Sequence, residues 1–182
     1  YSNMPLRIRD AFEKKGVMYV RKCGDNDNFG LGWRTLFGSD NRLEVERSLD
    51  QQNIQYEWLK TGGLITRSIR PGVWPHPVTR ELSWINQAQH WHFYCLPEKT
   101  RLAISKLFDN CDYPRNCFYG DGSIISDEDM QIILDQYPKY EVAIPWQKGD
   151  VILVDNILCA HSRNPYVGQR KIFVCFGNMT SF

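Results

Sequence analysis

The sequence predicts a mainly β fold with helical decoration, arranged as an antiparallel sheet or jelly roll. Three apolar, strand-like segments follow one another after residue 141, each bounded by glycine or proline. Helical patterns lie between strand-like segments but do not alternate regularly with them, which weakens a doubly wound α/β alternative. The length of 182 residues suits one domain with its own core, so we expect residues 1–182 to form a single domain.

The composition excludes several classes of protein. Hydrophobic residues make up 42% and charged residues 24%, which argues against bulk disorder. Lys and Arg number 22 against 21 Asp and Glu, so a net charge of +1 gives no overall field to attract nucleic acid or anionic lipid. The aliphatic run 151–154 is far shorter than the roughly 20 residues of a membrane span. We therefore expect neither a nucleic-acid partner nor membrane insertion.

The six cysteines favour a reduced, cytoplasmic protein. None lies in a C-x-x-C pair, so neither a zinc ribbon nor a thioredoxin motif is indicated. Cys159 and Cys175 lie in apolar runs, where a free thiol behaves as a small hydrophobe. Their even number permits a disulfide framework, but a chain of this length does not need one.

The N-terminal half is expected to begin with a helix over 5–15, which ends at Gly16. A second helix over 43–49 is predicted after Asp40, a possible N-cap. Gly62-Gly63 predicts a hairpin between two of the strands. Strands in this half are expected at 17–20, 33–37, 54–58, 64–69 and 82–85.

The C-terminal half is expected to contain two helices followed by strands. One helix covers 97–108, and Ser126 caps a second one that Pro138 ends. The strands are expected at 142–145, 151–154 and 171–176.

Four histidines are candidates for metal binding. In a strand, residues two apart share a face, so His90 and His92 could meet one metal ion. The alternative for this pair is a partly buried, hydrogen-bonded histidine. His76 lies between prolines, which favours a surface loop.

His161 has the more informative context, because it follows the apolar strand 151–154 and precedes Arg170 at the head of the closing strand. Antiparallel strands joined by a loop bring such positions close together. A histidine that holds a metal, beside an arginine that binds a carboxylate, is the minimum needed to chelate a keto acid at iron. The alternative is that His161 ends a strand and Arg170 pairs with a surface carboxylate.

Several short motifs carry a family resemblance. They are YGDGS at 119–123, PWQKGD at 145–150, VDN at 154–156, AHSR at 160–163 and GQRK at 168–171. With 15–21, 32–37 and 86–92, they resemble the TauD/TfdA family of iron(II)- and 2-oxoglutarate-dependent oxygenases, and within it the SyrP-like branch. The resemblance covers almost the whole chain and implies a double-stranded β-helix, or jelly roll.

The resemblance also implies roles for individual residues. His161 matches the distal histidine that binds Fe(II), and Arg170 matches the arginine that binds the far carboxylate of 2-oxoglutarate. Asn86 and His92 match positions near the substrate pocket. The implied reaction decarboxylates 2-oxoglutarate to succinate and hydroxylates a small substrate, an amino acid or a carrier-bound amino acid.

The chain departs from the family in two motifs. No histidine is followed two residues later by Asp or Glu, although the family holds iron with such a pair, and the family's GGET segment is missing. We therefore expect the C-terminal part of a longer oxygenase domain, a jelly roll without its first strands. An upstream segment or another chain would cover the open sheet edge, so oligomerisation is an open question. This chain alone is expected to bind iron poorly.

Two alternatives to an active oxygenase are kept open. One is a catalytically inactive relative that serves as a binding or scaffold module. The other is a cupin-type metal enzyme that uses His90, His92 and His161.

Overall fold

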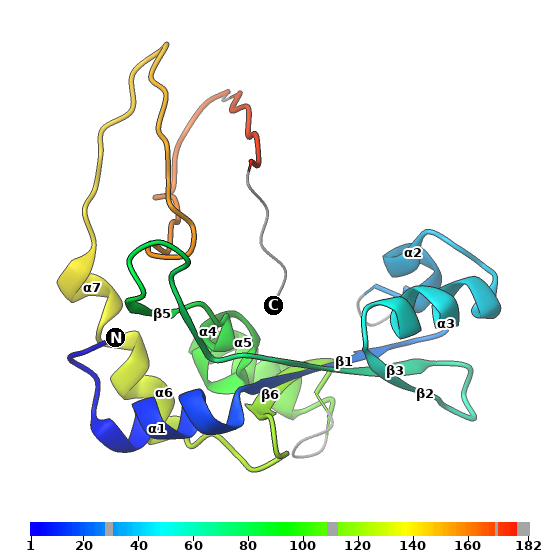
Figure 1. Cartoon of the computed structure of the whole chain (residues 1–182). Coiled ribbons are helices and arrows are strands. Elements are labelled where there is room, and N and C mark those ends of the chain that lie inside the picture. Colours follow the sequence, from blue (N-terminus) through cyan, green and yellow to red (C-terminus); the bar gives the residue numbers. More distant parts are fainter. Residues whose placement is uncertain (28–30, 109–112, 170, 178–182) are drawn as a thin grey trace.

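The centre of the molecule is a four-stranded antiparallel sheet with the strand order β2-β3-β1-β6 (Figure 1). The computed structural model describes residues 1–27, 31–108, 113–169 and 171–177. A two-stranded hairpin, β4-β5, forms a second sheet. The strands are β1 (Val17–Cys23), β2 (Gln55–Trp58), β3 (Leu64–Arg70), β4 (Val73–Pro75), β5 (Leu82–Trp84) and β6 (Arg115–Tyr119).

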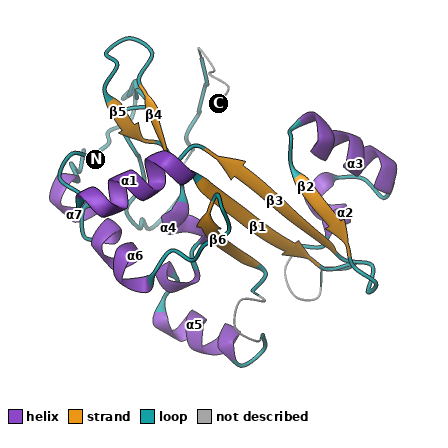
Figure 2. Cartoon of the chain, turned by 60° about the horizontal axis from the view of Figure 1, so that its bottom comes forward, coloured by secondary structure: helices purple, strands orange, loops and turns teal. Residues whose placement is uncertain are grey.

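Helices gather at the two ends of the large sheet (Figure 2). One group, which contains α1, α4 and α6, lies at the end where β1 begins, and the other group, α2 and α3, lies where β1 ends. The helices are α1 (Leu6–Lys15), α2 (Trp33–Phe37), α3 (Arg42–Gln51), α4 (Ala88–Trp91), α5 (Glu98–Ser105), α6 (Asp127–Leu134) and α7 (Tyr137–Tyr140), with a 3-10 turn η1 (Phe93–Cys95).

The two helix groups cover the same face of the sheet with two separate apolar cores. Side chains alternate between faces along a strand. Val17 and Cys23, at the two ends of β1, therefore point to this face, together with every second residue between them. Val17 packs in a core with residues of α1 and α6, and Cys23 packs in a core with residues of α2 and α3. The middle of this face therefore lies between two cores.

Most predicted elements of the N-terminal half are confirmed, including the first helix and the hairpin of β2 and β3. The strand predicted at 33–37 is wrong, because these residues form α2 between Gly32 and a left-handed Gly38. The Trp33 side chain is fully buried, and its indole N–H donates to the Gly62 carbonyl at 3.1 Å. Burial of this large ring therefore outweighs the weak β preference of the short segment.

Two helix boundaries differ from the sequence prediction. Asn41, rather than Asp40, caps α3, because its side chain accepts a hydrogen bond from the Leu43 N–H at 3.0 Å. Ser126 caps α6 as predicted and accepts from the Asp129 N–H at 3.1 Å. Pro138 is predicted to end this helix, but the helix already ends at Leu134. Pro138 instead lies in the first turn of α7, where a missing N–H is tolerated.

The strands predicted at 142–145, 151–154 and 171–176 are wrong, because the described residues from 141 to 177 form neither helix nor strand. The segment runs away from the large sheet (Figure 1), and the side chains of Val151 and Leu153 are 92% and 99% exposed. A strand is stable only when it pairs and buries its apolar face, and these residues do neither within the described ranges.

The C-terminal segment contacts the rest of the molecule through an interaction with His76. His76 Nε2 donates to a carboxylate oxygen of Asp155 at 2.9 Å, and His76 Nδ1 accepts from the Thr79 N–H at 3.0 Å. His76 lies in a loop, as predicted, but it is buried rather than on the surface.

The predicted mainly β class is therefore only partly correct. The described residues combine antiparallel sheets with helices and close no barrel, so the jelly roll stays a prediction. Of the helices in the described ranges, none has the length and apolar character that a membrane span requires.

Candidate functional site

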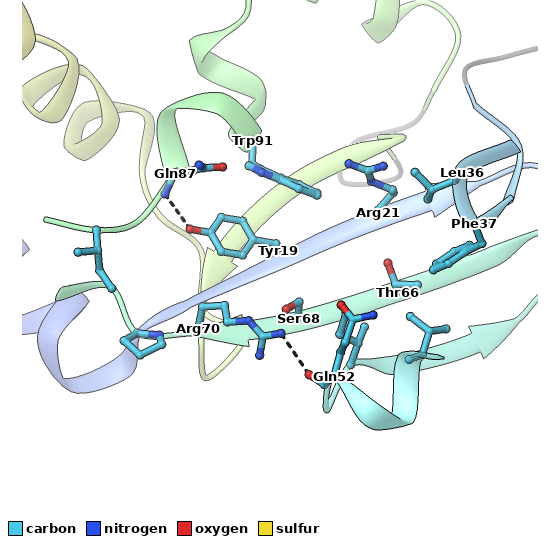
Figure 3. Close-up of a pocket in the computed structure, with 14 residues that line it drawn as sticks. Tyr19, Arg21, Leu36, Phe37, Gln52, Thr66, Ser68, Arg70, Gln87 and Trp91 are labelled. Carbon is cyan, nitrogen blue, oxygen red and sulfur yellow. Dashed lines mark hydrogen bonds between the residues drawn. The ribbon is translucent and has the colours of Figure 1, made fainter. Parts of the chain in front are cut away.

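A cavity of about 480 Å³ lies over the middle of the helix-covered sheet face, between the two cores (Figure 3). The strands supply its polar floor, α2 and α3 supply apolar side chains, and the segment that contains α4 supplies a further wall. The lining residues are Tyr19, Arg21, Leu36, Phe37, Leu49, Gln52, Ile54, Thr66, Ser68, Arg70, Pro71, Ile85, Gln87 and Trp91.

The register of β1 and β3 creates the polar floor. Tyr19 stands opposite Ser68, and Arg21 stands opposite Thr66. The pleat directs all four side chains to the covered face. The sheet therefore holds a phenol, a guanidinium group and two hydroxyls on one face, at positions fixed by backbone pairing.

Tyr19 links the floor to the wall. Its hydroxyl oxygen accepts a hydrogen bond from the Gln87 N–H at 2.8 Å. Burial raises the pKa of Tyr19 to about 12, even though this hydrogen bond acts in the opposite direction. The phenol is therefore neutral at physiological pH, and it adds no negative charge to the cavity.

Trp91 stacks close to two guanidinium groups. The guanidinium carbons of Arg21 and Arg115 lie 5.1 and 5.4 Å from the centre of its ring. The two arginines stand directly opposite each other across β1 and β6. Both distances are within the range of cation–π attraction, which holds the arginines against the indole.

Arg70 supplies the second positive charge that lines the cavity. Two of its N–H groups donate to the backbone carbonyls of Ile69 and Gln52, at 3.2 and 3.1 Å. The lining contains no aspartate or glutamate. The cavity can therefore accept a small anion that also has a flat or apolar part.

Asn86 and His92, the predicted substrate-pocket residues, flank Gln87 and Trp91 but are not among the lining residues. The Asn86 amide donates to the Gly72 carbonyl at 2.8 Å, and His92 Nε2 donates to the Ile125 carbonyl at 3.0 Å. Both side chains are buried. These bonds hold the segment that supplies the wall, and a direct contact of either residue with a substrate stays a prediction.

His92 makes stability depend on pH. Burial lowers its pKa below the ordinary 6.5, against the smaller opposing effects of the Ile125 carbonyl and Asp127. Below about pH 6.5, His92 therefore binds a proton more readily in the unfolded chain than in the folded chain. The free energy of unfolding should fall as the pH drops through this range. His92→Gln keeps a donor for Ile125 and removes the titration. Urea denaturation at several pH values should show a shallower decrease for this variant, and an unchanged slope would exclude His92 as the cause.

The predicted face shared by His90 and His92 is wrong, because Ala88–Trp91 forms α4 and His92 ends it. His90 is exposed, whereas His92 is buried. His161 lies exposed in the C-terminal segment. Arg170 lies outside the described residues, so a common cavity for His161 and Arg170 stays a prediction.

The described residues do not form an iron site. Within the described ranges, no three His, Cys, Asp or Glu side chains gather closely enough to hold a metal ion. One imidazole provides too few ligands for a stable iron(II) site. The described part of the chain therefore contains no complete set of iron ligands, and the role of His161 as a ligand stays a prediction.

Comparison with known proteins assigns the chain to a family. Residues 1–176 match the family described as "Taurine catabolism dioxygenase TauD, TfdA family". The chain belongs to the TauD/TfdA family. This membership confirms the resemblance stated from the sequence motifs, and it covers β1, β3 and α4, which build the cavity.

Two relatives within the TauD/TfdA family are similar over most of this chain. A "Dapdiamide synthesis protein DdaC" of Enterobacter agglomerans is 34% identical over 163 residues, 90% of this chain and 49% of the relative. A clavaminate synthase-like protein of Arabidopsis thaliana is 28% identical over 167 residues, 88% of this chain and 47% of the relative. The chain thus spans about half the length of these relatives.

Proposed function

We propose that the protein to which this chain belongs is an iron(II)- and 2-oxoglutarate-dependent oxygenase. It hydroxylates a small, amino-acid-like substrate, free or carrier-bound, while 2-oxoglutarate is decarboxylated to succinate. The TauD/TfdA match over residues 1–176 carries this proposal. The relative named for dapdiamide synthesis supports a small-molecule substrate.

The cavity supports a small substrate as well. Its volume of about 480 Å³ is typical of sites that take small molecules. Its floor belongs to a sheet and therefore holds polar groups in fixed positions. In this proposal, the residues that line the cavity recognise the substrate. His161 contributes to the iron centre, and Arg170 contributes to binding of the cosubstrate.

We infer a cytoplasmic location from the cysteines. The five described cysteines, Cys23, Cys95, Cys117, Cys159 and Cys175, are free thiols. Free thiols are typical of a reducing compartment.

The test is oxygen-dependent formation of succinate from 2-oxoglutarate by the natural gene product, with candidate amino acids as substrates. His161→Ala should reduce turnover to the background rate, because a site that loses one iron ligand no longer holds the metal productively. His90→Ala is the matched control, since His90 is also exposed, and it should keep full turnover.

Two other outcomes separate the alternatives. A well-folded gene product that binds amino acids but forms no succinate would indicate an inactive binding or scaffold module and contradict the oxygenase proposal. The failure of His161→Ala to reduce turnover would overturn its role as an iron ligand. A loss of metal binding in His90→Ala would instead favour the cupin-type site.

A further inference from the structure

We propose that the cavity binds the carboxylate of a small ligand through Arg21, with the flat or apolar part of that ligand against Trp91. This inference deepens the proposed function, because it specifies how a substrate of the proposed amino-acid-like class is held. The same carboxylate chemistry is present in 2-oxoglutarate, so the experiment below distinguishes the two sources.

Arg21 has unused hydrogen-bonding capacity at the cavity. A guanidinium group carries five N–H donors in a planar fork that matches a carboxylate. In the part of the chain that the structure describes, the Arg21 side chain stacks against Trp91 but makes neither a hydrogen bond nor an ion pair. Figure 3 shows its guanidinium beside the Trp91 ring, above the strand that carries Thr66. A carboxylate that enters the cavity can therefore receive two parallel hydrogen bonds from Arg21.

The charges around the cavity favour an anion. Arg21 and Arg115 face each other across the strands, and like charges in directly opposite positions destabilise a sheet. Arg70 adds a further positive charge, and no acidic residue lines the cavity. A bound carboxylate would reduce this repulsion between the arginines, and the reduction would contribute to the binding free energy.

The opposite face of the same sheet shows how an arginine is neutralised when it has a structural role. Arg67 follows Thr66 on β3 and therefore points away from the cavity. It forms an ion pair with Glu57 of the neighbouring strand at 3.2 Å. Arg21, on the cavity side, has no comparable acidic partner within the described residues. Among the residues that the structure describes, Arg67 has an acidic partner and Arg21 has none, and this contrast favours a ligand-binding role for Arg21.

The experiment measures binding by this chain, without iron and without turnover. The probes are N-acetyl-L-alanine, its uncharged amide of nearly the same shape, and 2-oxoglutarate, each titrated by calorimetry or NMR. The variants are Arg21→Gln, Arg21→Lys and, as the matched control, Arg67→Gln. Circular dichroism confirms that each variant is folded.

We expect a carboxylate probe to bind at least tenfold more tightly than the amide, and Arg21→Gln to weaken it at least tenfold, as for a charge-assisted hydrogen bond. Arg21→Lys should recover part of the affinity, because it keeps the charge but loses the fork. Arg67→Gln should bind normally. Preference for N-acetyl-L-alanine would identify the substrate as the source of the carboxylate, and preference for 2-oxoglutarate would identify the cosubstrate.

Three results would overturn the inference. The first is that N-acetyl-L-alanine and its amide bind equally well while 2-oxoglutarate does not bind. The second is that folded Arg21→Gln binds the carboxylate as tightly as the unsubstituted protein does. The third is that Arg67→Gln loses as much affinity as Arg21→Gln. None of them depends on turnover, so the oxygenase proposal can fail while the carboxylate site holds, and the reverse is also possible.

Discussion

Replacing Phe12 with alanine should lower the free energy of unfolding by about 3–5 kcal/mol, the usual cost of removing a fully buried aromatic ring. Phe12 is 0% exposed, and its ring centre lies 4.4 Å from that of Trp84 and 5.2 Å from that of Tyr119. The substitution therefore removes contacts that join α1 to both sheets at once. Urea denaturation measures the change.

Leu6→Ala is the control for the Phe12 substitution. Leu6 lies on the same helix but is 63% exposed, so its loss should change stability by less than about 0.5 kcal/mol. A Phe12→Ala variant as stable as Leu6→Ala would show that α1 does not pack against the sheets as described.

Gly120→Ala should destabilise the fold by about 3 kcal/mol or more, as an overpacked site with no room to relax. A Cβ atom at Gly120 would lie 2.0 Å from the Lys15 carbonyl oxygen, which belongs to the backbone. The Gly120 N–H also donates to the Gly16 carbonyl at 3.1 Å, so the two segments cannot separate without losing this bond. Thermal and urea unfolding of the variant measure the effect.

Gly122→Ala tests whether the effect comes from contact. Gly122 lies in the same turn with a φ of +84°, but nothing lies within 4 Å of its added Cβ. Only backbone strain of about 1 kcal/mol is expected there. If both alanine variants lose the same stability, the close approach of the turn to Lys15 is not the cause.

Local sequence signals predicted the elements that depend on local chemistry. The helix before Gly16, the hairpin at Gly62-Gly63 and the Ser126 cap all follow from residues within a few positions of each other. The α2 helix was missed because burial of Trp33 in a distant core decides its conformation. The strands predicted after residue 141 failed because strand formation needs a partner, which an apolar pattern does not supply.

The cavity was missed for a related reason. β1 and β3 carry polar residues on both faces, such as Thr66-Arg67-Ser68 in a row, and such residues equally suit a strand exposed to solvent. Only the pairing of Tyr19 with Ser68 and of Arg21 with Thr66 reveals that these side chains share one cavity. The motif 86–92 lies in the segment that supplies one wall of the cavity. However, its lining residues are Gln87 and Trp91, whereas Asn86 and His92 bind the backbone.

The proposed carboxylate-binding site occupies the middle of the covered sheet face, between the two cores. NMR of this chain during titration with N-acetyl-L-alanine and 2-oxoglutarate tests it most directly, through the Arg21 side-chain N–H and the Trp91 indole N–H. If Arg21 binds the carboxylate, one of these ligands should shift both signals, and the Arg67 side-chain signal, on the opposite face, should stay unchanged. Shifts confined to Arg67 and its neighbours, or no shift at Arg21 with either probe, would contradict it.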